Sequence, residues 1–72
     1  MSVFKSLELV GTSGTSFEDA VRVAVKRAGE TMRDLEWLEV VEQRGYIRDG
    51  EIHEYQVKVR VWFKLEGGDG RG

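Results

Sequence analysis

Residues 55–65, YQVKVRVWFKL, alternate between two kinds of side chain with almost no interruption. The odd-numbered positions carry the apolar set, Tyr55, Val57, Val59, Val61, Phe63 and Leu65. The even-numbered positions carry Gln56, Lys58, Arg60, Trp62 and Lys64. A period of two is typical of a β-strand that has one face against a core. The segment therefore predicts a long strand with one buried face, which another part of the chain has to cover.

A second strand is predicted immediately before this one. Asp49-Gly50 is a strong hairpin signal, because a type I′ turn needs positive φ at both of its central residues. Strand character begins at Glu36, with Leu38 on one face and Trp37 on the other. Gly45 predicts a bulge or bend in this strand. The two segments should form an antiparallel hairpin.

The cover for the hairpin is predicted to be a single helix. After a first strand over residues 3–10 and a loop over 11–16, apolar residues recur at steps of three and four, as in a helix with one buried stripe. These residues are Phe17, Val21, Ala24, Ala28, Met32 and Leu35. Ser16 is the expected N-cap, and the helix should end near Asp34. The order is β-α-β-β, which predicts an α+β fold with an antiparallel sheet and one helix on its apolar face.

The chain is too short to be stabilised comfortably by its own core. It has 72 residues, which allows one domain. We expect that domain to occupy residues 1–66 and the Gly-rich tail 67–72 to be disordered. There is no cysteine for a disulfide and only one histidine for a zinc site. Two strands of roughly 36–43 Å also exceed a helix of ~27 Å. Part of the sheet is therefore left uncovered, and oligomerisation is the expected source of extra stability.

Composition excludes several classes of protein. The net charge is −2 with the two signs mixed, and the pI is 5.4, so a basic nucleic-acid-binding surface is not expected. No apolar run approaches the ~20 residues that span a bilayer, and the N-terminus does not have the apolar core of a signal peptide. We therefore expect a cytoplasmic protein that binds neither nucleic acid nor membrane.

Four polar or aromatic side chains are candidates for binding. Trp37 is expected to point away from the core, either as a stacking platform for a planar ligand or as packing in a subunit interface. Gln56 has the donors and acceptor to read the imide edge of a flavin or a nucleobase, or it faces solvent. Arg44 is either a phosphate contact or a surface arginine. Trp62 shares the face of Gln56 and fits an interface better than a ligand site.

The same sequence offers little for catalysis. His53 is the only histidine, and no acid or nucleophile is patterned beside it. No set of nucleophile, base and orienting group can be assembled, and no metal-ligand motif is present. A binding module with no catalytic and no metal-ligating residues is therefore favoured over an enzyme.

Several segments, taken in their order and spacing, resemble the dodecins, which are small flavin-binding proteins. The resemblance covers about residues 3–66. The matching segments are Val3-Phe4-Lys5, Leu9-Val10-Gly11-Thr12-Ser13, Glu36-Trp37-Leu38-Glu39-Val40, Glu54-Tyr55-Gln56-Val57 and Phe63-Lys64-Leu65. Trp62 is a departure from the family pattern, which has a small residue at that place.

The resemblance implies a fold, an assembly and a ligand. It implies a three-stranded antiparallel sheet partly wrapped around one helix, and a homododecameric shell with flavins paired between subunits. Trp37 would stack on the isoalloxazine ring and Gln56 would hydrogen-bond its pyrimidine edge. Arg44 would contact the phosphate of FMN, whereas members without this arginine favour riboflavin. Some members also bind coenzyme A.

Three hypotheses for function follow. The leading one is an oligomer that stores and buffers flavin and quenches its photochemistry. The second is an oligomeric scaffold without a specific flavin role, or a shell protein that binds coenzyme A. The third is a flavin-dependent oxidoreductase, which would need substrate space beside the ring that two stacked flavins would fill.

Overall fold

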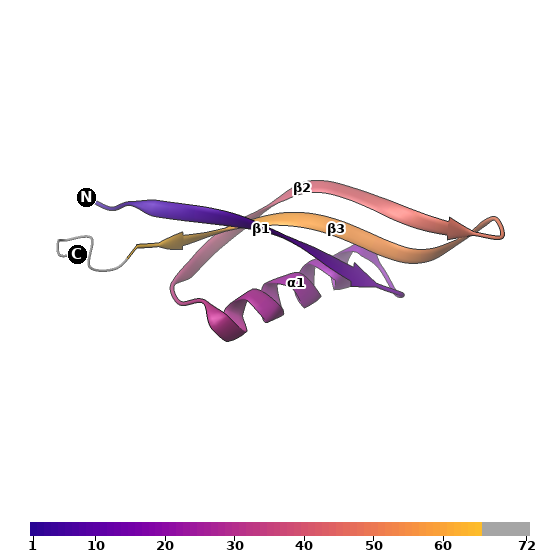
Figure 1. Ribbon diagram of the computed structural model, residues 1–72, viewed down its shortest axis with the longest axis horizontal. Coiled ribbons are helices and arrows are strands. Elements are labelled where there is room, and N and C mark those ends of the chain that lie inside the picture. The colour runs from indigo at the N-terminus through magenta and orange to yellow at the C-terminus, as the bar shows by residue number, and fades with distance from the viewer. Residues whose placement is uncertain (66–72) are drawn as a thin grey trace.

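The computed structural model describes residues 1–65. The elements run β1 (Phe4–Ser13), α1 (Phe17–Thr31), β2 (Leu35–Arg48) and β3 (Glu51–Lys64). The sheet has the order β1-β3-β2, and both pairings are antiparallel. Figure 1 shows α1 lying along one face of the sheet while the β2–β3 hairpin extends past it. The β-α-β-β architecture predicted from the sequence is confirmed, and the predicted tail 67–72 lies outside the described residues.

The core lies between α1 and the central strand β3. Its six buried residues are Val57, Val59, Val61, Ala20, Ala24 and Ala28. The three valines belong to the odd-numbered set that the alternation placed inside, so the predicted face of β3 is confirmed. The alanines let α1 approach the sheet closely. The closest approach is at Gly11, where an added Cβ would lie 2.2 Å from the carbonyl oxygen of Ala20.

The start of α1 agrees with the prediction, and its end does not. The Ser16 hydroxyl accepts a hydrogen bond from the Asp19 amide at 3.0 Å, as an N-cap does. The helix stops at Thr31 instead of near Asp34, because Met32 is already extended and Asp34 adopts a left-handed φ of 59°. The Asp34 carbonyl then accepts a hydrogen bond from the Lys64 amide, which ties the turn to β3. Within residues 1–65 no helix is long and apolar enough to cross a membrane.

The hairpin turn is the predicted one. Asp49 and Gly50 have φ of 54° and 76°, which are the positive values that a type I′ turn requires. The pairing of β2 with β3 shifts register at three places: Leu35/Trp37, Val40/Glu42 and Tyr46/Ile47. The irregularity expected at Gly45 therefore lies one residue further along. These shifts decide which side chains face each other at the site described below.

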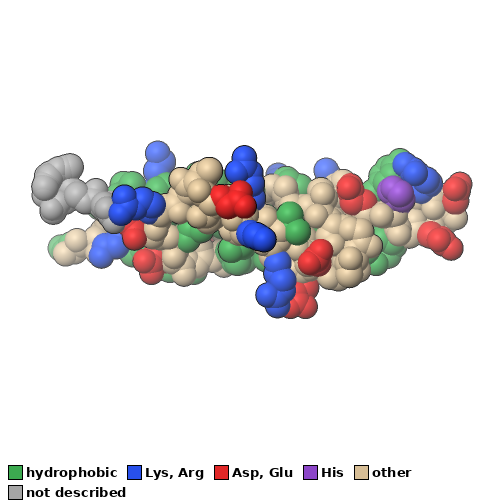
Figure 2. Space-filling view, turned by 90° about the horizontal axis from the view of Figure 1, so that it is seen from below, with side chains coloured by type: hydrophobic (Ala, Val, Ile, Leu, Met, Phe, Trp, Pro, Cys, Tyr) green, Lys and Arg blue, Asp and Glu red, His purple; other side chains and the backbone are tan. Residues whose placement is uncertain are grey.

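A large part of the sheet has no cover among the described residues, 1–65. The helix packs against β1 and β3, and the described molecule is 55 Å long. Leu38, Val40 and Ile47 on β2 are 38%, 49% and 66% exposed. Figure 2, seen from the α1 side, shows hydrophobic side chains between the charged ones and at the hairpin end beside the histidine. Exposed apolar surface of this extent is typical of subunit interfaces.

Candidate ligand-binding face

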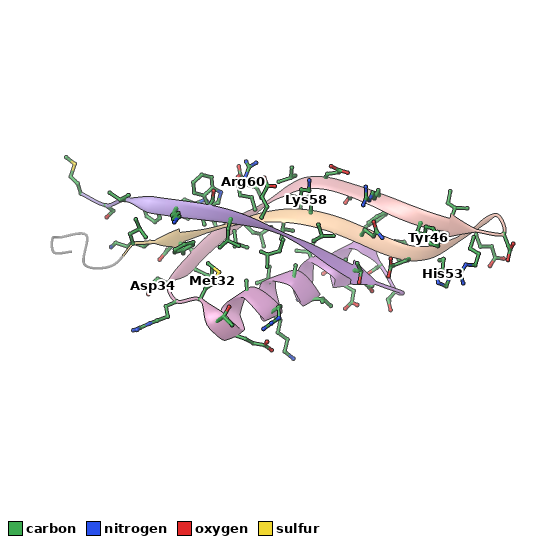
Figure 3. All side chains as sticks on the ribbon, in the orientation of Figure 1. Met32, Asp34, Tyr46, His53, Lys58 and Arg60 are labelled. Atoms are coloured by element: carbon green, nitrogen blue, oxygen red, sulfur yellow. The ribbon has the colours of Figure 1, made fainter. Side chains whose placement is uncertain are left out.

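The sheet face turned away from α1 is called the outer face. The even-numbered side chains of β3 lie on it, and Figure 3 shows Lys58 and Arg60 pointing away from the helix. The strand pairing places residues of β1 and β2 opposite them, namely Phe4, Ser6, Glu8, Val10, Trp37, Glu39, Glu42 and Arg44. All four candidate residues from the sequence are therefore on this face.

Three aromatic residues of the outer face form an aromatic cluster, defined as Phe4, Trp37 and Trp62. The rings of Phe4 and Trp37 have centroids 4.9 Å apart and are tilted by 41°. Trp37 and Trp62 are register partners on neighbouring strands, with centroids 6.4 Å apart and planes within 29° of parallel. Trp37 remains 50% exposed. An indole supported by its neighbours yet half open to solvent can accept a planar ligand on its free surface.

An ion-pair network fixes the polar edge of the aromatic cluster. Arg60 donates to the Glu8 carboxylate at 2.7 Å and lies 3.6 Å from Glu39. The hydrogen bond from Arg60 lowers the pKa of Glu8, and the same contact raises the pKa of Arg60. The indole N–H of Trp62 donates to Oε1 of Glu39 at 2.8 Å. The Glu39 carboxylate is thus contacted by both Arg60 and Trp62, and it fixes the orientation of the Trp62 ring.

Gln56 and Arg44 form a second, polar cluster. The Arg44 Nε–H donates to Oε1 of Gln56 at 2.7 Å, and Nε2 of Gln56 donates to Glu54 at 2.8 Å. Arg44 also lies 3.9 Å from Glu42, so its charge is partly offset. With Val10 and Lys58, three of these residues line a hollow of about 220 Å³. Gln56 keeps one amide N–H and one lone pair for a ligand, and Arg44 keeps its terminal N–H groups.

The two clusters lie far apart in one chain. Trp37 pairs with Trp62, whereas Arg44 pairs with Gln56, six residues earlier on β3. At ~3.3 Å per residue the clusters are separated by about 20 Å along the strand. The structure therefore brings together Gln56 and Arg44 but not Trp37. A flavin ring system is shorter than this separation, so one chain cannot place both Trp37 and Gln56 on the same ring.

At the hairpin end, His53 lies beside an aromatic side chain. Its ring packs against Tyr46, with centroids 5.8 Å apart and planes at 73°, and Arg48 lies 5.7 Å from the same tyrosine ring. Figure 3 shows Tyr46 and His53 on the part of the hairpin that extends beyond α1. In the described part of the chain, no group of three or more His, Cys, Asp or Glu side chains is placed to hold a metal ion.

Comparison with known proteins places the chain in a family. A sequence model of the dodecins matches residues 3–66. A dodecin of Thermus thermophilus is 48% identical over 64 residues, which is 89% of this chain and 93% of that protein. The chain belongs to the dodecin family. The resemblance inferred from the ordered segments is thus confirmed.

Solved structures of dodecins share the fold. A Thermus thermophilus crystal structure matches with a TM-score of 0.87 and 47% identity, covering 92% of this chain and 97% of that one. The dodecin of Streptomyces coelicolor matches with a TM-score of 0.86 and 43% identity, covering 90% and 93%. A third relative, the calcium dodecin of Mycobacterium tuberculosis, is 37% identical over 65 residues, 90% of this dodecin and 92% of that protein.

The sequence reasoning missed the residues that orient the candidates. Glu54 and Glu42 restrain Gln56 and Arg44, and Glu39 holds Trp62. If residues are counted outward from the Asp49-Gly50 turn, position 37 pairs with position 62. The contact between the two tryptophans could therefore have been predicted from the sequence.

Proposed function

We propose that this dodecin is a flavin-binding storage protein whose ligand site is completed between subunits of a homododecamer. The observation that carries the proposal is the half-exposed indole of Trp37, about 20 Å along the sheet from the amide of Gln56. One flavin contacts both groups only if they come from two copies of the chain. The uncovered apolar side chains of β2 provide the surface on which those copies meet.

The residues fit the chemistry of a flavin. The free face of Trp37 suits the isoalloxazine ring. The remaining N–H of Gln56 can donate to a carbonyl on the pyrimidine edge of the isoalloxazine ring, and its remaining lone pair can accept from the adjacent ring N–H. Because Glu54 and Arg44 fix the amide, these two groups are already oriented before a ligand arrives. When bound and excited by light, a flavin is a strong one-electron oxidant, and indole is a ready donor. Close stacking on Trp37 therefore quenches excitation before photochemistry occurs, and no turnover is involved.

Arg44 is proposed to favour FMN over riboflavin through its terminal N–H groups. Its side chain is 68% exposed and already pairs with Glu42, so solvent and that carboxylate weaken a phosphate contact. The preference for FMN should therefore be about 1 kcal/mol. Coenzyme A binding, implied by the family resemblance, stays a prediction without assigned residues.

Fluorescence titration with riboflavin and FMN, combined with native mass spectrometry, tests the proposal. We expect quenching of both flavins and a mass of about twelve times 8.2 kDa, with little folded monomer. Trp37→Ala should weaken the binding of both flavins by at least ~0.5–1.5 kcal/mol, to which the free energy of the lost apolar burial is added. Tyr46→Ala, another exposed aromatic of β2, is the matched control. An assembled parent that quenches neither flavin would support the scaffold hypothesis instead.

The phosphate contact has its own control on the same strand. Arg44→Ala should reduce FMN affinity more than riboflavin affinity, and added salt should reduce the difference in the parent. Arg48→Ala removes an exposed arginine that packs over Tyr46 and should leave both affinities unchanged. Equal losses for the two flavins in Arg44→Ala would remove the phosphate contact from the proposal.

A further inference from the structure

Trp62 and Glu39 form a pair whose chemistry goes beyond packing. The indole of Trp62 lies 6.4 Å from that of Trp37, centroid to centroid, with nearly parallel planes. Its N–H points at a carboxylate oxygen of Glu39 at 2.8 Å. Glu39 faces one further charged group, Arg60 at 3.6 Å, and Arg60 is itself hydrogen-bonded to Glu8. Trp37 therefore has beside it a second indole that is already hydrogen-bonded to a base.

Oxidation makes this hydrogen bond chemically important. Removing one electron from an indole leaves a radical cation whose N–H is a far stronger acid than that of neutral indole. A carboxylate at hydrogen-bonding distance takes up the proton directly, without a diffusing water or buffer molecule. Short separation and near-parallel rings also favour electron exchange between the two indoles. Oxidation of Trp62 is therefore assisted by Glu39.

We propose that Trp62 and Glu39 act as a proton-coupled electron donor to oxidised Trp37. When Trp37 has lost one electron to an excited flavin, or to another one-electron oxidant, an electron passes from Trp62 to Trp37. The proton on Nε1 of Trp62 passes to Oε1 of Glu39. Trp37 is restored, Trp62 becomes a neutral radical, Glu39 becomes protonated, and the oxidant keeps the one electron. Return of that electron to Trp62, with the proton from Glu39, restores the starting state.

The consequence is a change in where and how charge is held. The oxidising equivalent moves from Trp37 on β2 to Trp62 on β3. Its return then requires a proton to move back as well as an electron. This inference rests on the proposed function where the oxidant is a flavin. The Trp62–Glu39 pair itself can be tested in protein without any ligand.

Ligand-free protein gives the first test. A nanosecond ultraviolet flash photoionises tryptophan, and transient absorption distinguishes the radical cation from the neutral radical. The variant Trp37→Phe keeps Trp62 and Glu39. In it we expect the radical cation of Trp62 to convert to the neutral radical at a rate that does not depend on buffer concentration. Adding Glu39→Gln, which keeps a hydrogen-bond acceptor but removes the base, should slow this conversion about a hundredfold and make it buffer-dependent. Equal rates with and without Glu39→Gln would overturn the proposal.

FMN-loaded protein gives the second test, with visible light that excites only the flavin. The parent should form the neutral tryptophan radical, and its decay should slow in D2O. Trp62→Phe keeps an aromatic ring but not the donor, so only the radical cation of Trp37 should be seen. A neutral radical of equal yield in Trp62→Phe would overturn the relay. Failure of FMN to bind in the titration would remove the proposed function, yet the ultraviolet experiment would still decide whether Glu39 takes the proton.

Discussion

The two faces of β3 are made by alternate residues of one strand, and they differ in how far the chain completes them. Val57, Val59 and Val61 on the inner face are 0–2% exposed under the alanines of α1. Gln56 and Trp62 on the outer face are hydrogen-bonded to glutamates, and no layer lies above them among residues 1–65. The inner face of β3 is thus a finished core, whereas its outer face becomes a site only when a second copy is added.

The largest expected effect comes from disturbing the inner face where strand and helix are closest. Gly11→Ala places a Cβ 2.2 Å from the Ala20 carbonyl oxygen and 2.9 Å from Ala24 Cβ, so the helix has to move. We expect a loss of about 3 kcal/mol in the free energy of unfolding, measured in urea. A Cβ added at Gly14 meets no atom of the described structure within 4 Å, so Gly14→Ala should change the free energy of unfolding by less than about 0.5 kcal/mol. Equal stability of Gly11→Ala and the parent would contradict the close packing.

Two valines that face each other across the strands compare covered with uncovered sheet. Val59 is 0% exposed, and its register partner Val40 is 49% exposed. Val59→Ala should lower the free energy of unfolding by about 2 kcal/mol. Val40→Ala should act mainly on assembly, so the variant should need a higher protein concentration than the parent to form the oligomer, which native mass spectrometry over a dilution series measures. Assembly of Val40→Ala at the same concentration as the parent would show that no partner covers Val40.

The helix that covers the inner face depends on its N-cap for a smaller part of its stability. Ser16→Ala removes the acceptor of the Asp19 amide and should cost about 1 kcal/mol in thermal or urea unfolding. Thr15→Ala, next to it and exposed, should be close to neutral. Flavin affinity should be unchanged in both, since neither touches the outer face. A flavin defect in Ser16→Ala would mean that the two faces are coupled.

The smallest expected effect is on the outer face and depends on pH. Arg60 lowers the pKa of Glu8 mainly through their hydrogen bond, so this contact stabilises the folded form above the unfolded pKa of Glu8. Its contribution is lost as the pH falls through the lower, folded value. The parent should therefore lose more stability on acidification than Glu8→Gln, and high salt should reduce the difference. Glu36→Gln, an exposed glutamate at the start of β2, is the control.

The fold was largely predictable because its signals are local. The alternation in residues 55–65, the turn at Asp49-Gly50 and the helical spacing from Phe17 each depend on neighbours in the sequence. The end of α1 was misplaced because Leu35 continues the apolar spacing, whereas Asp34 leaves the helix to hydrogen-bond with β3. A tertiary contact overrode the local pattern there.

The candidate site was less predictable because it depends on register. Strict counting from the turn pairs Arg44 with Tyr55, but the shift at Tyr46/Ile47 brings Arg44 opposite Gln56. A second shift, at Val40/Glu42, restores the pairing that sets Trp37 beside Trp62. Bulges of this kind are set by packing across strands and have weak signals in the sequence. The separation of Trp37 from Gln56 follows from the pairing once it is known.

In the proposed site, Trp37 of one copy and Gln56 of another serve the same flavin. The direct measurement mixes Trp37→Ala and Gln56→Ala subunits, by co-refolding equal amounts, and counts tight flavin sites by fluorescence titration. In a two-fold interface that shares the site, random mixing regenerates about a quarter of the sites, because some pairs contain one intact Trp37 facing one intact Gln56. We predict that the mixture recovers about this share of tight flavin sites, whereas each variant alone has none. A mixture that binds only as the average of the two separate variants would contradict the claim.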